Sequence, residues 1–234
     1  MPLAALVTVG ILAMFGDREG IARNLLTAQD IGVYYVHLPG GRLRVQHLRA
    51  SLPQGVHIHE VEGVRSEWWY MVEYPRKLMR MFLRGTHRYG ILCDSDTVFH
   101  PDLVKRLTMA LDDAGPRWEA LHMCPGCLWG RRQHDYTWTR TPEDHVSMSW
   151  FRPVGKGRVA AFTGPNSCWV GGPFAVFVTK HGAQLLLNDY NAMKYRRTPS
   201  DVTLNRVAVR YPHRYFVAYD PPLCVEKDGG SSQH

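Results

Sequence analysis

The sequence predicts an α/β fold in which helices cover both faces of a mostly parallel central sheet, so that the chain forms three layers. A β-type run at residues 3–12, a helical pattern at residues 21–26 and a second β-type run at residues 33–38 make a strand–helix–strand unit. Parallel neighbours require such a crossover, which is right-handed in nearly all proteins. An apolar strand at residues 89–93 and a strand followed by a helix at residues 172–187 continue the alternation.

Length and composition indicate one domain, residues 1–234, with a full hydrophobic core. Of the 234 residues, 45% are hydrophobic, which suits a single large domain. The mean hydropathy is −0.27, and no apolar stretch approaches the roughly 18 residues of a membrane span, so we expect none. The most apolar segment, residues 3–15, has neither a basic start nor an A-x-A cleavage site. We therefore expect a core strand there instead of a signal peptide, and a cytoplasmic protein.

The charge balance points to an anionic partner. There are 28 Lys and Arg against 21 Asp and Glu, a formal net charge of +7, and a basic chain attracts nucleic acids and diphosphates alike. The arginines are dispersed and form no long basic block, so the sequence favours a diphosphate over nucleic acid. Five cysteines are an odd number, and Cys93 and Cys168 lie in apolar runs, which is typical of reduced, buried thiols.

Two carboxylates follow the buried strand at residues 89–93. Asp94 and Asp96 are separated by one residue, and side chains alternate on an extended backbone, so we expect both to point to the same side. Like charges held that close must capture a proton or a cation, and carboxylate oxygens are preferred ligands of Mg²⁺ and Mn²⁺. The alternative is that the acids merely cap the helix that opens at residues 100–102. That alternative accounts for Asp102 but leaves the pair too far upstream.

An apolar stripe at residues 66–84 predicts helix before the acidic strand. Pro75 interrupts the stripe, so we expect either a kink or a second helix with Pro75 in its first turn. Basic residues such as Arg76 lie off the stripe, and one or two of them are placed to reach a bound diphosphate. Upstream, His57 and His59 share one face of a strand, which favours the polar face of an edge strand over a pair of metal ligands.

Later segments carry turn and cap signals. Residues 128–164 are polar and aromatic with no sustained period, and a long segment of this kind in a compact domain is typically functional, for example as a flap. Gly171 and Gly172 remove side chains where the backbone approaches something closely. Thr179 and Ser200 are placed to cap the helices that follow them.

Together these features resemble the GT-A class of nucleotide-sugar-dependent glycosyltransferases. The matching features are the strand–helix–strand start, the Asp-X-Asp motif Asp94-Ser95-Asp96, the Gly171-Gly172 turn before a strand and helix, and the acidic helix start Ser200-Asp201. Residues 172–187 and the ending 220–223 with Ser231-Ser232 are also loosely similar to the lipopolysaccharide and collagen glycosyltransferase family. The resemblance implies a Rossmann-like GT-A fold and transfer of a sugar from a UDP-sugar or GDP-sugar to a hydroxyl of a glycan or protein acceptor.

The resemblance also implies a division of labour and a metal. Residues 1–100 would form the nucleotide-binding half and residues 101–234 the acceptor-binding half. Asp94 and Asp96 would hold Mn²⁺ or Mg²⁺ against the donor diphosphate, with Asp96 as the direct ligand, because a cation neutralises the charge that develops on the leaving group. A late residue adds a further ligand in many relatives. The candidates here are His213, Asp228 and His234, and we assign the further metal ligand to His234.

The remaining roles follow from the same resemblance. Asp201 matches the general base of inverting members, which takes the proton of the acceptor hydroxyl. Its alternative is a helix-cap carboxylate, and a retaining enzyme would not need the base. The nucleotide sugar is assigned to Thr8, Arg18, Arg76 and Ser95, and the donor or acceptor sugar to Trp169, Gly171 and Gly172. Arg18 is equally well explained as a solvated surface residue.

Two other classes of protein stay open as alternatives. The run Asp94-Ser95-Asp96-Thr97-Val98 also meets the first motif of haloacid-dehalogenase-type phosphatases, in which the first Asp is the nucleophile and the second the acid/base. However, a strand–helix–strand unit precedes the motif and no GDxxxD-like cluster follows it. The other alternative is a basic nucleic-acid-binding module that uses the arginines and aromatic residues of 128–152. It leaves the acidic pair unexplained.

Overall fold

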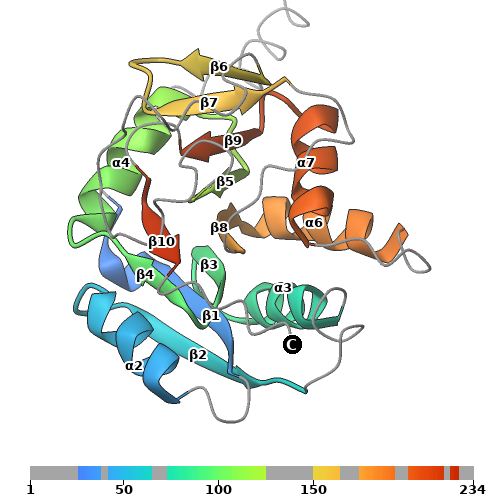
Figure 1. The fold of residues 1–234 in the computed structure, drawn as a ribbon. Coiled ribbons are helices and arrows are strands. Elements are labelled where there is room, and N and C mark those ends of the chain that lie inside the picture. The colour runs from blue at the N-terminus through green and yellow to red at the C-terminus, as the bar shows by residue number, and fades with distance from the viewer. Residues whose placement is uncertain are drawn as a thin grey trace, which may run out of the picture.

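The computed structural model describes residues 26–37, 42–64, 73–124, 150–163, 174–192, 200–218 and 222–226. Within them, eight strands form one sheet in the order β2-β1-β3-β8-β5-β9-β7-β6, and β10 pairs with β4 in a second, two-stranded sheet (Figure 1). The strands are β1 (Ile31–His37), β2 (His57–Glu62), β3 (Tyr89–Asp94), β4 (Thr97–Phe99), β5 (Ala120–His122), β6 (Phe151–Val154), β7 (Val159–Phe162), β8 (Ala175–Thr179), β9 (Tyr215–Ala218) and β10 (Cys224–Glu226). The helices are the short 3₁₀ helix Ala28–Asp30 and α2 (Arg42–Ser51), α3 (Tyr74–Arg84), α4 (Leu103–Ala114), α6 (Lys180–Ala192) and α7 (Ser200–Arg210).

The large sheet is mixed but mostly parallel in direction. β1 pairs in parallel with both β2 and β3, and β5 pairs in parallel with β9. β8 runs antiparallel to β3 and β5, and β7 runs antiparallel to β6 and β9. Six of the eight strands (β1, β2, β3, β5, β6 and β9) therefore point one way, and β7 and β8 are reversed.

The parallel strand–helix–strand unit lies later in the chain than predicted. β1, α2 and β2 form it, with Gly32 opposite His57 and His37 opposite Glu62. Both edges of β1 are occupied, by β2 and by β3, so the neighbours of this strand come from later in the chain. The strand predicted at residues 33–38 is present, but it opens its unit instead of closing it. The first strand predicted, residues 3–12, lies outside the described residues.

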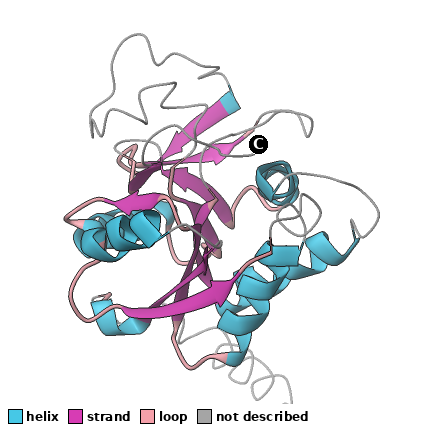
Figure 2. Ribbon diagram, turned by 60° about the horizontal axis from the view of Figure 1, so that its bottom comes forward, coloured by secondary structure: helices cyan, strands magenta, loops and turns pink. Residues whose placement is uncertain are grey.

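Helices cover both faces of the large sheet (Figure 2). On one face, α3, α6 and α7 bury a core that includes Tyr34 of β1 and Leu92 of β3. On the other face, α2 and α4 bury a second core that includes Val33 and Ile91, the preceding residues of the same strands. Neighbouring residues fall into opposite cores because side chains alternate along a strand. This arrangement confirms the predicted α/β class with three layers.

Local sequence signals set several helix ends. Pro75 lies in the first turn of α3, as predicted, where its missing N–H costs no hydrogen bond. Thr179 caps α6 as predicted, since its hydroxyl accepts a 2.9 Å hydrogen bond from the Gly182 N–H. We expected Ser200 to cap α7 from the preceding position, but it is itself the first residue of that helix. Among the helices that the structure describes, none is both long and apolar enough to pass through a bilayer.

One glycine brings α3 close to the acidic strand. A Cβ atom on Gly90 of β3 would stand only 2.8 Å from the Phe82 ring of α3. The helix therefore packs on β3 at a distance that only a residue without a side chain allows. This close packing places the first turn of α3 beside the carboxyl end of β3.

Candidate functional site

The acidic pair lies where β3 ends. β3 stops at Asp94, residues 95 and 96 form a turn, and β4 begins at Thr97. The carboxyl ends of β1, β2, β3, β5 and β9 all lie at one edge of the large sheet, because these strands point the same way. In open α/β sheets, ligands bind outside the carboxyl ends of the strands. The pair is therefore at the edge where a ligand site is expected.

The two carboxylates make their contacts with different elements. Asp94 contacts α3 and the residue before β8, whereas Asp96 lies near α2. We expected both to point to one side by strand alternation, but that premise is wrong because the extended backbone ends at Asp94. The physical reason lies in the residue types, since Asp and Ser favour turns over strands.

Asp94 is held in one orientation by two hydrogen bonds. The Tyr74 hydroxyl donates to Oδ1 at 2.6 Å, and the Phe174 N–H donates to Oδ2 at 3.1 Å. The backbone N–H of Asp94 donates in turn to the Phe174 carbonyl at 2.9 Å. Tyr74 is fully buried and its ring meets the Phe174 ring edge to face. The position of this carboxylate is therefore set by groups that are themselves fixed.

Asp96 is a buried carboxylate beside a cation. The residue is 9% exposed, and Oδ2 lies 3.8 Å from Nη1 of Arg44 on α2. That separation is an ion pair, but it is longer than a hydrogen bond. A buried carboxylate needs compensating contacts, and the ion pair with Arg44 is one of them.

The negative charges of the acidic pair affect the pKa of the neighbouring Cys93 thiol. Cys93 is free and fully buried one residue before Asp94. Burial raises its pKa well above the ordinary value of 9.0, and the charges of Asp94 and Asp96 raise it further. The thiol is therefore neutral and unreactive, as the sequence predicts for this cysteine.

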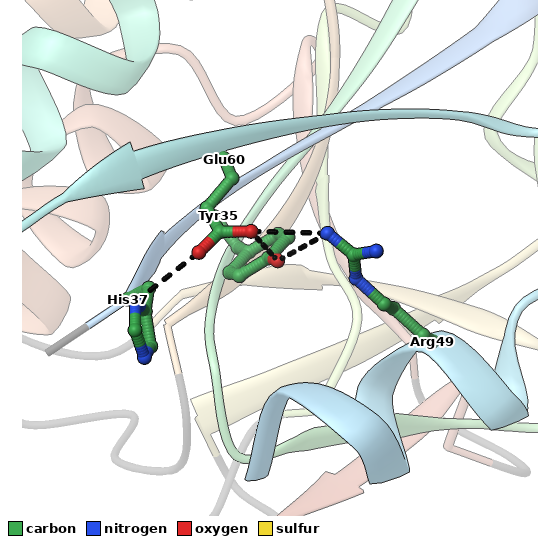
Figure 3. A network of polar contacts seen from close by, with 4 residues as sticks. All are labelled: Tyr35, His37, Arg49 and Glu60. Atoms are coloured by element: carbon green, nitrogen blue, oxygen red, sulfur yellow. Dashed lines mark hydrogen bonds and ion pairs between the residues drawn. The ribbon is translucent and has the colours of Figure 1, made fainter. Parts of the chain in front are cut away.

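A network of four side chains ties α2 to the neighbouring strands β1 and β2 (Figure 3). Oε2 of Glu60 accepts hydrogen bonds from the Tyr35 hydroxyl at 2.7 Å and from Nη2 of Arg49 at 3.0 Å. Oε1 of Glu60 lies 3.1 Å from Nδ1 of His37. Burial, followed by the hydrogen bond to Glu60, raises the pKa of Tyr35 to about 12. The phenol therefore stays neutral and donates to the carboxylate.

His37 brings an imidazole to the same edge of the sheet as the acidic pair. It is the last residue of β1, and the residue before it, Val36, is paired with Asp94. Glu60 engages Nδ1, whereas Nε2 is buried and has no hydrogen-bond partner among the described residues. The network thus orients a ring nitrogen that still has bonding capacity.

The structure places some of the predicted site residues. Ser95 lies in the turn between the two acids. Arg76 is buried in α3, where it donates to Glu73 at 2.7 Å and to the Tyr190 carbonyl at 2.6 Å. These contacts join α3 to α6 and give no support to its predicted role at the diphosphate. Asp201 lies in the first turn of α7, and its side chain is outside the described residues. Thr8, Arg18, Trp169, Gly171, Gly172, Asp228 and His234 lie outside them as well.

His213 is ruled out as a metal ligand beside the acids. It lies between α7 and β9, just before the amino end of β9. Tyr215, the first residue of β9, is paired with Ala120, the first residue of β5. Since Asp94 is at the carboxyl end of a strand that points the same way, His213 is at the opposite edge of the sheet.

The histidines of β2 form a ring cluster. His59 stacks on Tyr34 with ring centroids 4.4 Å apart, and His87 lies 5.0 Å from His57 and 5.1 Å from His59 by the same measure. Among the described residues, no group of three or more His, Cys, Asp or Glu side chains is arranged to hold a metal ion. The cluster is consistent with the favoured interpretation, the polar face of a strand, with aromatic stacking added.

Comparisons with known proteins identify no family. No family model matches the chain, and no curated protein matches it. Among solved structures, it is similar to a crystal structure of a glycosyltransferase involved in the glycosylation of the major capsid of PBCV-1, with a TM-score of 0.49 and 15% identity over 86% of this chain and 94% of that one. At that score and identity the likeness carries no conclusion about activity.

Proposed function

We propose that this chain is a metal-dependent glycosyltransferase of the GT-A class, which moves a hexosyl group from a nucleoside-diphosphate sugar to an acceptor hydroxyl. The observation that supports it best is the acidic pair at the carboxyl end of β3, in which Asp94 is pinned and Asp96 is buried. A substrate that carries a diphosphate and a divalent cation suits both this pair and the net charge of +7.

The residues of the pair fit a hard cation such as Mn²⁺ or Mg²⁺. Carboxylate oxygens are the preferred ligands of these ions, which usually keep substrate phosphates and waters in their shell. Asp96 would be the direct ligand, because its carboxylate is buried at the carboxyl end of β3 and such oxygens are preferred by these ions. Asp94, which Tyr74 and the Phe174 N–H hold in place, would meet the ribose or a water bound to the ion.

The chemistry divides between this edge of the sheet and α7. The bound cation would supply positive charge against the leaving diphosphate. Tyr74 and the Phe174 N–H hold Asp94 in place, so this carboxylate does not need to rearrange when the donor binds. Asp201, at the start of α7, would accept the proton of the attacking hydroxyl in an inverting reaction. The further roles proposed for Thr8, Arg18, Ser95, Trp169, Gly171, Gly172 and His234 belong to this same function.

The two alternatives gain less from the geometry. A phosphatase would use an oxygen of Asp94 to attack phosphorus, which the hydrogen bonds to Asp94 neither favour nor prevent. The GDxxxD-like acidic cluster of that class does not follow the motif in the sequence. Nucleic-acid binding was assigned to residues 128–152, most of which lie outside the described residues. The nucleic-acid alternative gives the pinned acid no role.

The proposal is tested by a thermal-shift panel of nucleoside diphosphates and sugar nucleotides, each with and without Mn²⁺. A ligand that binds only the folded state raises Tm in proportion to ln(1 + [L]/Kd). We expect one nucleoside diphosphate to raise Tm only when the metal is present. The gain should disappear in Asp96→Ala and persist in Asp112→Ala, which removes an exposed carboxylate from α4.

Two results would overturn the proposal. One is a wild-type protein whose Tm responds to no nucleotide in the presence of metal. The other is trapping of an aspartyl-phosphate on Asp94, which would establish the phosphatase alternative.

A further inference from the structure

A pocket of about 300 Å³ lies away from the acidic pair. Its wall comes from the end of α4, from β6 and β7, and from the turn that precedes β9. Between β3, which carries the pair, and β9 lie β8 and β5. At about 4.8 Å per strand, the pocket is therefore roughly 14 Å or more across the sheet from the acidic residues. Nothing in the proposed glycosyl transfer uses it.

Two arginines and a histidine line this pocket, and no described residue pairs with their side chains. Arg117 follows α4, Arg152 lies in β6 and His213 precedes β9, and all three are exposed. Neither arginine has an ion pair or a hydrogen bond from its side chain to a described residue. None of the described residues that line the pocket is acidic. Guanidinium groups repel each other, so a pocket whose described lining holds two of them and no carboxylate favours an anion.

The carboxylate nearest in sequence to the residues of this wall already forms an ion pair with another arginine. Asp113 of α4 precedes the lining residue Ala114, but it is buried. Its Oδ1 accepts from Nη2 of Arg158 at 2.6 Å, and its Oδ2 accepts from Nε of the same residue at 3.0 Å. A bidentate pair of this kind is not available to neutralise the pocket.

The floor of the pocket is apolar. Phe216 of β9, Ala161 of β7 and Val154 of β6 line it together with two prolines. The volume is at the lower end of the range for small-molecule sites, which are mostly apolar with a few charged groups that fix orientation. An inorganic ion would use the arginines but would leave this floor in contact with water.

We propose that this pocket binds a small organic anion, in which one carboxylate or phosphate meets Arg117 and Arg152 while an apolar body covers the floor. Arg forms paired hydrogen bonds with both kinds of head group, and its planar group also stacks on flat ligands. The site is separate from the donor site and does not depend on the glycosyltransferase activity.

The test is isothermal titration calorimetry of the full chain with phenyl phosphate and with benzoate, which differ in head group. Inorganic phosphate and benzyl alcohol are the probes that lack the apolar body or the charge. We expect at least one of the two organic anions to bind, and binding to weaken about tenfold or more in Arg117→Gln/Arg152→Gln, because hydrogen bonds between charged groups are lost. The phenyl phosphate and benzoate arms identify the preferred head group.

The matched control is Arg214→Gln, which removes an exposed arginine that does not line the pocket. It should bind as the wild type does, and so should Asp96→Ala. Without probe, the Tm of the double variant should equal or slightly exceed that of the wild type, because repulsion between the two arginines is relieved. If the double variant does not fold, probe binding is measured with the two single variants instead. Equal binding by wild type and by every folded pocket variant would overturn the site. The ligand class would be overturned if inorganic phosphate bound as tightly as phenyl phosphate. It would also be overturned if benzyl alcohol bound as tightly as the organic anions.

Discussion

The Tyr74 hydroxyl donates a 2.6 Å hydrogen bond to Oδ1 of Asp94, across the junction between the first turn of α3 and the last residue of β3. The phenol is buried and has little freedom to point elsewhere. A hydrogen bond to a charged carboxylate is stronger than one between neutral groups. This single contact therefore links the packing of α3 to the orientation of the acidic pair.

Tyr74→Phe should weaken the proposed activity with little change in fold. The substitution keeps the buried ring and removes only the donor, at a cost of about 1.5–3 kcal/mol for a hydrogen bond to a charged group. We expect kcat/KM to fall roughly tenfold to a hundredfold, with metal-dependent stabilisation by the nucleotide reduced in parallel. Steady-state kinetics and Tm measure the two effects.

Tyr211→Phe is the matched control, since Tyr211 lies after α7 and is absent from the acidic pair's hydrogen bonds. It should keep the wild-type kcat/KM. If Tyr74→Phe matched the wild type in both measurements, the Tyr74 contact would be irrelevant to the site.

The sequence predicts the acidic pair and the fold class because both depend on local patterns. Alternation of strands and helices leads to the α/β class, and an apolar strand that ends in Asp94 is visible in eleven letters of sequence. The strand order across the sheet, with β8 between β3 and β5, is not visible. It depends on long-range pairing, which leaves no local periodicity.

The partners of the acidic pair escape sequence reasoning for the same reason. Tyr74 and Phe174 are 20 and 80 residues away from Asp94 in the chain. The Pro75 signal correctly places a helix start beside Tyr74 but does not say which strand end it will meet. The sequence predicts a diphosphate contact for Arg76 because it lies off the apolar stripe of a helix that leads straight into the acidic strand. Here it is buried between α3 and α6.

The Tyr35 phenol predicts a specific alkaline transition. Its pKa is raised from 10.0 to about 12 by burial and by the bond to Glu60. The folded state therefore holds this proton more tightly than the unfolded state does. The contribution of Tyr35 to the free energy of unfolding is complete below pH 10 and is lost as the pH rises from 10 towards 12.

Tyr35→Phe should flatten that part of the stability profile. Urea midpoints measured from neutral pH to pH 11 should fall less steeply in the variant than in the wild type, although its stability at pH 7 should be lower because Glu60 loses a donor. Parallel curves above pH 10 would show that Tyr35 does not titrate as proposed.

His122 should govern part of the acid unfolding. It is the last residue of β5, it is buried, and neither ring nitrogen has a hydrogen-bond partner among the described residues. Desolvation by burial lowers its pKa from 6.5 to about 4. The neutral ring is thus favoured in the folded state, so its contribution is complete above pH 6.5 and is lost as the pH falls towards 4.

His122→Leu should therefore resist acid better than the wild type. The wild type should lose about 3 kcal/mol more unfolding free energy than the variant between pH 7 and pH 3.5, since each pKa unit corresponds to about 1.4 kcal/mol. Leu also suits the apolar side chains around the ring, among them Val176 and Leu204. His213→Asn, at an exposed position, is the control for the removal of a histidine. An acid midpoint that His122→Leu leaves unchanged would mean that water or protein reaches the ring and satisfies it.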